Sequence, residues 1–120
     1  MPHTVAAAEL ARLLSLLSHP HRIQIVEELR FGEQDVNHLQ QALGVSHSRV
    51  SQHLAQMRAA RVVSERREGR HVFYHLKQPE IAHWLLEGLG FLEAELREAE
   101  GLRDAVEKAR HLWSEEPDEG

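Results

Sequence analysis

Apolar residues recur at helical spacing along most of the chain, and this pattern changes to two-residue alternation near residue 62. The first stripe, at spacing i, i+3, i+4, i+7, predicts a helix over residues 6–17. It consists of Leu10, Leu13, Leu14 and Leu17. Pro20 suits the first turn of a second helix over residues 21–30, because a helix leaves the N–H groups of its first turn unbonded.

A pair of short helices follows, joined by a tight turn. The apolar spacing predicts helices over residues 34–43 and 47–60, and Gly44-Val45-Ser46 connects them. Ser46 is suited to cap the second of these helices, since its hydroxyl can accept a hydrogen bond from a free backbone N–H. Two short helices joined by a three-residue turn that contains Gly are typical of a DNA-binding helix-turn-helix.

Residues 62–76 alternate between apolar and polar side chains on either side of a glycine. Strands over residues 62–67 and 71–76 flank Glu68-Gly69-Arg70, which predicts a β-hairpin directly after the helix-turn-helix. Pro79 then begins a long helix with an apolar stripe of Leu85, Leu89, Leu92 and Leu96. The predicted fold is mainly α with a β-hairpin wing. It is a winged helix-turn-helix made of two helices, the helix-turn-helix pair, two strands and a long C-terminal dimerisation helix.

Composition limits the class of protein. The 120 residues include no cysteine, which excludes disulfides and thiolate metal sites. No apolar run approaches the length of a membrane span and the N-terminal residues lack a secretory pattern, so we expect a cytoplasmic protein with no membrane partner. We expect residues 1–113 to form a single DNA-binding and dimerisation domain, followed by an acidic, disordered tail over residues 114–120.

Charge is distributed unevenly within a net charge of -5. Residues 46–77 contain seven Lys or Arg and two Glu, whereas residues 79–120 contain four Lys or Arg and twelve Asp or Glu. The helix over residues 47–60 has no acidic residue, although an ordinary surface helix favours Asp or Glu in its first turn. A cationic centre with an acid-free helix is typical of a surface that meets DNA phosphates.

The outer face of that helix has side chains suited to reading base edges. Its short polar groups, its guanidinium and the amide of Gln52 can donate to and accept from the major groove. The basic hairpin can contact the phosphate backbone or enter the minor groove. His53 lies near the apolar side, where a structural histidine and a phosphate contact are alternatives. The candidate DNA-binding residues are Ser46, His47, Ser48, Arg49, Ser51, Gln52, His53, Gln56, Arg67, Arg70 and His71.

Two leucine stripes exceed what one small core can bury. We expect them to form a homodimer interface, in which two-fold symmetry sets the two DNA-reading helices about one DNA turn, or a multiple of one, apart on a near-palindrome. The alternative is that the stripes pack against each other within one chain. The candidate interface residues are Leu10, Leu13, Leu14, Leu17, Leu85, Leu89, Leu92 and Leu96.

Several motifs together resemble the ArsR/SmtB family of bacterial repressors. They are Leu17-Ser18-His19-Pro20-His21-Arg22, Leu39-Gln40-Gln41-Ala42-Leu43-Gly44-Val45-Ser46, Val50-Ser51-Gln52-His53-Leu54 and Gly69-Arg70-His71-Val72-Phe73-Tyr74. Ser-Gln-His-Leu inside a helix-turn-helix is specific in this order and spacing. The resemblance covers about residues 13–92. It implies a dimeric winged helix whose first and last helices form the interface, and operator binding that an inducer relieves.

The resemblance does not extend to the metal sites of the family. Thiolate members place cysteines where this chain has Asp35, Asn37 and Gln40. Zinc-type members place ligands where this chain has Gln78, Glu80, Phe91 and Ala94, and three of these four ligate metal poorly. We therefore expect a repressor without the usual metal sites and without a cofactor. Its trigger would be another ligand, a partner protein or its own concentration.

Ten histidines support a second hypothesis, a metal-responsive repressor with a divergent site. Glu80, His83 and Glu87 share a helical face at i, i+3, i+7 and can chelate Zn²⁺ or Ni²⁺, and His19-Pro20-His21 sets two imidazoles around a proline. A third hypothesis is a helical protein–protein module whose basic hairpin binds an acidic partner. An enzyme is not expected, because the chain has no Gly-x-Ser-x-Gly, no phosphate-binding glycine loop and no His-Glu-x-x-His.

Overall fold

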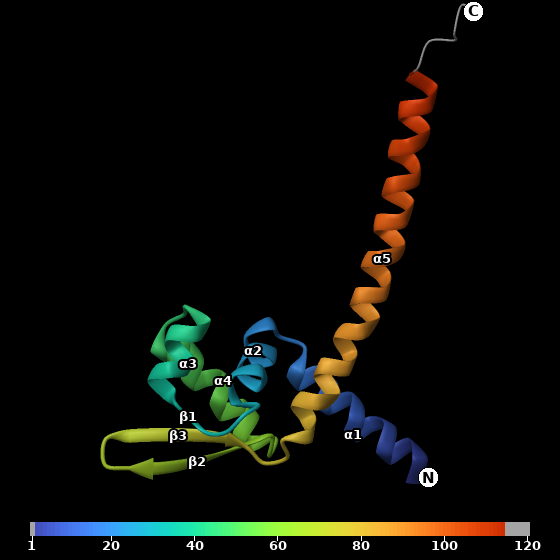
Figure 1. Ribbon diagram of the computed structural model, residues 1–120. Coiled ribbons are helices and arrows are strands. Elements are labelled where there is room, and N and C mark those ends of the chain that lie inside the picture. Colours follow the sequence, from blue (N-terminus) through green and yellow to red (C-terminus); the bar gives the residue numbers. More distant parts are fainter. Residues whose placement is uncertain (1, 115–120) are drawn as a thin grey trace, which may run out of the picture. The chain divides into compact units, whose positions relative to one another are not determined.

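The computed structural model describes residues 2–114 and contains the predicted helices and hairpin (Figure 1). The helices are α1 (Pro2–Leu17), α2 (Pro20–Leu29), α3 (Val36–Leu43), α4 (His47–Ala59) and α5 (Glu80–Ser114). The strands are β1 (Gln34–Asp35), β2 (Val63–Glu68) and β3 (His71–Leu76). The fold is therefore mainly α with a β wing, as the sequence predicts.

Contacts divide the chain into two compact units, with the boundary between Trp84 and Leu85. The first unit contains every element up to the first residues of α5, and the second unit contains the rest of α5. Ser114 is the last residue of α5 rather than the start of the predicted tail, and the remainder of that tail, residues 115–120, lies outside the described residues. None of the helices in residues 2–114 combines the length and apolarity needed to cross a membrane.

The core of the first unit is formed by apolar side chains from α2, α3, α4 and the sheet, together with Leu17 of α1. Figure 1 shows the three helices on the same side of the strands. Ile25 of α2, Leu39 of α3 and Leu54 of α4 each have 0% of their surface exposed. Full burial of side chains of this size stabilises the fold by about 1.5–3 kcal/mol each, so these residues fix how the three helices pack.

The third helix begins later than predicted, because two residues assigned to it form a strand instead. Gln34 and Asp35 are β1, which pairs antiparallel with Tyr74 and Phe73 of β3. Asp35 has an extended backbone, and its carboxylate accepts a hydrogen bond from the N–H of Asn37 at 2.7 Å. It is therefore the N-cap of α3, and a cap residue lies outside the helix that it begins.

The wing is a three-stranded antiparallel sheet in the order β1-β3-β2. Strands β2 and β3 pair along their whole length, from Val63 with Leu76 to Glu68 with His71. A two-residue connection joins them, and its first residue, Gly69, has φ +59. A type II′ hairpin turn requires a positive φ at that position, which favours glycine there.

Candidate nucleic-acid interface

The turn between α3 and α4 is set by one residue at each end. Gly44 adopts the left-handed conformation (φ 67), and its N–H donates to the carbonyl of Gln40 at 2.9 Å, which closes α3. Ser46 begins α4 by accepting a hydrogen bond from the N–H of Arg49 at 3.3 Å. The predicted three-residue turn and the predicted cap are both confirmed.

Helix α4 has a buried side and an exposed side, as its sequence predicts. Val50, Leu54 and Met57 are completely buried. Ser48, Gln52 and Gln56 are exposed on the other side, and no acidic residue occurs anywhere in α4. Among residues 2–114, the amide of Gln52 makes no hydrogen bond, so its donor and acceptor atoms are available to a partner. This face can bind polar edges without electrostatic repulsion from carboxylates.

The N-terminal end of α4 is exposed and polar. Ser46, His47 and Arg49 are all exposed there. The hydroxyl of Ser51 lies 3.4 Å from Nδ1 of His47, one turn away along the helix. Unbonded N–H groups and the helix dipole favour an anion at such an end, so it can receive a phosphate group.

His53 differs from the other candidates because it faces α2. Its Nδ1 accepts a hydrogen bond from Nε of Arg22 at 3.1 Å, and its ring is half-buried. Burial lowers the pKa of His53 below its ordinary 6.5, and the neighbouring His19 and Arg22 lower it further. Of the two interpretations that the sequence leaves open, this geometry matches the structural histidine.

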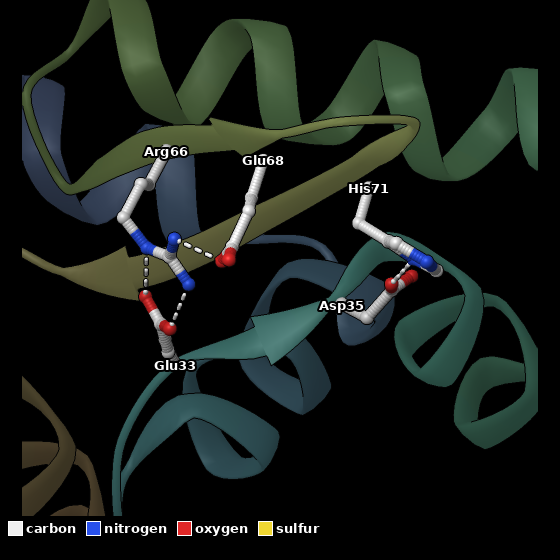
Figure 2. A network of polar contacts seen from close by, with 5 residues as sticks. All are labelled: Glu33, Asp35, Arg66, Glu68 and His71. Carbon is white, nitrogen blue, oxygen red and sulfur yellow. Dashed lines mark hydrogen bonds and ion pairs between the residues drawn. The ribbon is translucent and has the colours of Figure 1, made fainter.

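In the wing, Arg66 is held by two carboxylates (Figure 2). Its guanidinium donates to both oxygens of Glu33, at 2.6 Å and 3.2 Å, and to Glu68 at 2.6 Å. The same guanidinium carbon lies 4.6 Å from the centre of the Phe73 ring. The hydrogen bonds that Arg66 donates lower the pKa of Glu33, and its bonds to both glutamates raise the pKa of Arg66. Arg66 therefore joins the wing to the segment before β1 rather than presenting a free charge.

A second contact ties the wing to the helix-turn-helix. Nδ1 of His71 lies 2.8 Å from Oδ2 of Asp35 (Figure 2). The N–H of Asn37 and then His71 lower the pKa of Asp35, so this carboxylate stays ionised. His71, predicted to contact DNA, thus has a partner within the chain.

A fourth carboxylate, Glu65 of β2, also pairs with neighbouring groups. It lies 2.6 Å from Arg58 and 3.6 Å from Arg67, and it accepts a hydrogen bond from the Tyr74 hydroxyl at 3.1 Å. Partial burial by itself raises the pKa of Glu65, but these neighbours outweigh burial and lower the pKa. Burial and the bond to Glu65 raise the pKa of Tyr74.

Two exposed arginines lie at the tip of the wing. Arg67 is 73% exposed and only loosely paired, and Arg70 is exposed in the turn. Arg70 makes no hydrogen bond or ion pair within the described part of the chain. Within the described residues, the close ion pairs of residues 46–77 involve Arg58 and Arg66, whereas Arg67 and Arg70 at the tip remain able to meet phosphates.

The leucines predicted to form an interface fall into three groups by exposure. Leu10 and Leu14 on α1 and Leu89, Leu92 and Leu96 on α5 are exposed, while Leu13 and Leu85 are half-buried. Leu17 is only 3% exposed and belongs to the core of the first unit. Most of both stripes thus remains available for an interface.

The predicted metal candidates Glu80, His83 and Glu87 are exposed on α5. Another set of potential ligands is brought together by the fold: one ring nitrogen each of His19, His21 and His53 lie within 4.8 Å of one another. The sequence shows the first two beside Pro20, but their approach to His53 depends on how α2 packs on α4. Likewise, no local pattern pairs Asp35 with His71 or Glu33 with Arg66.

Comparison with known proteins agrees with this winged helix-turn-helix. The family model "Bacterial regulatory protein, arsR family" matches residues 19–65. The chain is similar to the HTH-type transcriptional repressor SmtB of Mycobacterium tuberculosis, 43% identical over 84 residues, which cover 70% of this chain and 60% of that relative. It is also similar to the biofilm growth-associated repressor of Xylella fastidiosa, 38% identical over 76 residues, 63% of this chain and 67% of the relative.

A solved structure gives the same result. The crystal structure of the transcriptional repressor BigR from Xylella fastidiosa aligns with a TM-score of 0.66 at 34% identity, and covers 76% of this chain and 92% of that one. The fold defines a winged helix-turn-helix protein. The chain belongs to the ArsR/SmtB family of bacterial regulatory proteins, which confirms the resemblance found in its motifs.

Proposed function

We propose that the chain binds a specific double-stranded DNA operator as a homodimer and represses transcription in the cytoplasm. The observation that carries this proposal is the outer face of α4, which is exposed, free of acidic residues and followed by a wing with exposed arginines at its tip. A winged helix-turn-helix uses such a helix in the major groove and its wing on the adjacent backbone. Its relatives are named as repressors, which supports the direction of regulation.

Each part of the proposed interface has a distinct task. Gln52 and Ser48 read base edges, because both are polar and exposed on the outer face of α4. The N-terminal end of α4, with Ser46 and His47, receives a phosphate. Arg67 and Arg70 contact the backbone and give affinity that does not depend on sequence.

We propose residues 1–113 as the DNA-binding and dimerisation domain. Leu10 and Leu14 on α1 and Leu89, Leu92 and Leu96 on α5 would form the dimer interface, since a single chain leaves them exposed. Two-fold symmetry would then present two copies of α4 to a near-palindromic site.

The test is a footprint of the purified full chain on a genomic fragment library at physiological salt. We expect protection of a near-palindromic sequence, and no such protection by a variant with Gln52→Glu, which adds a carboxylate to the reading face. The matched control Gln24→Glu makes the same change on an exposed position of α2 and should leave protection unchanged. Absence of any preferred duplex would overturn the proposal and favour an acidic protein partner instead.

The same footprint distinguishes the metal-responsive alternative. The protein is first dialysed against a chelator and then titrated with Zn²⁺, Ni²⁺ or Co²⁺. Unchanged operator affinity with all three ions would leave a repressor triggered by another ligand, a partner protein or its own concentration.

A further inference from the structure

Three imidazoles meet where the start of α2 packs on α4. The ring centres of His19 and His53 are 4.4 Å apart, those of His19 and His21 are 5.1 Å apart, and those of His21 and His53 are 5.5 Å apart. One nitrogen of each ring lies within 4.8 Å of the others. Neutral imidazole nitrogens are preferred ligands of Zn²⁺, Ni²⁺ and Co²⁺, and catalytic or exchangeable zinc sites commonly have three protein ligands.

One nitrogen in this cluster has no partner of its own. Nδ1 of His21 is buried, and no hydrogen bond to it is found among the described residues. A buried polar atom without a partner is costly, so such atoms are rare unless a bound species satisfies them. A cation is a suitable species here because the lone pair of a neutral imidazole is an electron-pair donor.

The backbone holds the first two rings in place. His19 is the N-cap of α2, with an extended backbone (φ -139), and its Nδ1 accepts the N–H of His21 at 3.2 Å. Pro20 between them is the first residue of α2, which fixes the turn that sets both rings toward α4. The cluster thus combines a rigid pair with one residue from the helix proposed to read DNA.

We propose that His19, His21 and His53 form a site for a divalent transition-metal ion that prefers imidazole, and that the ion competes with Arg22 for His53. The site is separate from Glu80, His83 and Glu87 on α5 and from the positions that bind metal in the resembled family members. It does not depend on the proposed binding of DNA.

The competition follows from the protons on His53. Because Nδ1 accepts from Nε of Arg22, a neutral His53 holds its proton on Nε2. A metal ion on Nε2 moves that proton to Nδ1, which then no longer accepts. A metal ion on Nδ1 occupies the lone pair directly. Either way Arg22 loses its bond to α4, while its Nη1 can still donate to the carbonyl of Leu16 at the end of α1.

The positive charges near His53 also affect how tightly the site binds a metal ion. Arg22 and Arg49 both act on the His53 ring electrostatically. The same positive charges oppose a bound cation. Replacing Arg22 by a neutral residue removes both a competitor and a repelling charge, and should tighten metal binding.

The experiment titrates the metal-free full chain with Co²⁺, followed by visible absorption, and then displaces Co²⁺ with Zn²⁺. We expect His21→Gln and His53→Gln to weaken binding at least ~10-fold and Arg22→Gln to tighten it several-fold. The control variant His83→Gln removes the imidazole of the candidate metal site on α5, and it should bind Co²⁺ as tightly as the unsubstituted chain does. Circular dichroism of each metal-free variant checks that it folds.

NMR of the unsubstituted chain tests the same site without substitutions. Zn²⁺ should shift the ring nitrogens of His19, His21 and His53 together, and the Arg22 Nε–H signal should lose its hydrogen-bonded position. Ring shifts confined to other histidines, or loss of binding only in His83→Gln, would overturn the proposal. An Arg22 signal that stays in place while the three rings bind Zn²⁺ would overturn the competition.

Discussion

His71 on the wing and Asp35 before α3 lie 2.8 Å apart, Nδ1 to Oδ2, although 36 residues separate them in the sequence. The same carboxylate caps α3 through the N–H of Asn37 at 2.7 Å. One side chain therefore links the first helix of the helix-turn-helix to the strand that forms the wing. This link adds to the backbone pairing of β1 with β3, which also joins the start of α3 to the wing.

The two roles of Asp35 can be separated by substitution. Asp35→Asn keeps an oxygen that caps α3 but removes the charge facing His71, whereas Asp35→Ala removes both. We expect the melting temperature to fall more for Asp35→Ala than for Asp35→Asn. Amide exchange at Phe73 should become faster in both variants, because β3 pairs with β1 there. Equal melting temperatures for the two variants would show that the cap contributes nothing.

The packing of α4 predicts a large stability effect at Leu54. Its side chain is 0% exposed, so Leu54→Ala should lower the free energy of unfolding by about 2–5 kcal/mol, through lost burial and a cavity. Phe31→Ala is the matched control, because Phe31 is 89% exposed, and its effect should stay within about 0.5 kcal/mol. Urea unfolding of both variants measures the difference. A similar loss at both positions would contradict the burial of this side of α4.

The lowered pKa of His53 predicts an acid-dependent loss of stability. As the pH falls through the ordinary value of 6.5, the unfolded chain takes up a proton at His53 that the folded chain does not. The free energy of unfolding should therefore decrease toward pH 5.5, and His53→Gln should reduce that slope. The groups facing this ring are His19, His21, Arg22 and Arg49, all of which are cationic when protonated and act in the same direction.

Urea unfolding at pH 7.5 and pH 5.5 measures this slope, and His75→Gln on the exposed face of β3 is the control that should retain it. An NMR titration should also place the His53 transition below 6.5. A His53 transition at or above 6.5 would contradict the lowering of its pKa by burial and neighbouring cations.

The exposed leucines of α5 predict an effect on association. Leu89→Asp places a charge in the proposed interface and should raise the dimer dissociation constant by ~30-fold or more, which corresponds to about 2 kcal/mol. Phe31→Asp makes a comparable change at an exposed apolar residue outside the leucine stripes. Sedimentation equilibrium compares the two variants. A monomer at all concentrations in the unsubstituted chain, or equal dissociation constants in both variants, would refute the interface.

The sequence predicted the parts of this fold that depend on local patterns. Helical periodicity located α4 and its buried side, Gly44 and Ser46 marked the turn, and Gly69 marked the wing. The sequence did not predict β1, because a two-residue strand is too short to show alternation and Gln34 is compatible with a helix. It could not indicate that Glu33 and Glu68 neutralise Arg66, or that Arg22 holds His53, since those contacts arise only when distant elements pack together.

The most direct measurement of DNA reading compares Gln52→Ala and Arg70→Ala by fluorescence anisotropy over a range of salt concentrations, on the operator and on a scrambled duplex. Gln52→Ala should lose about 1–3 kcal/mol on the operator and little on the scrambled duplex. Arg70→Ala should weaken both duplexes alike and reduce the slope of log K against log salt by about 1. Unchanged affinity and an unchanged salt slope in both variants would contradict DNA binding by α4 and the wing.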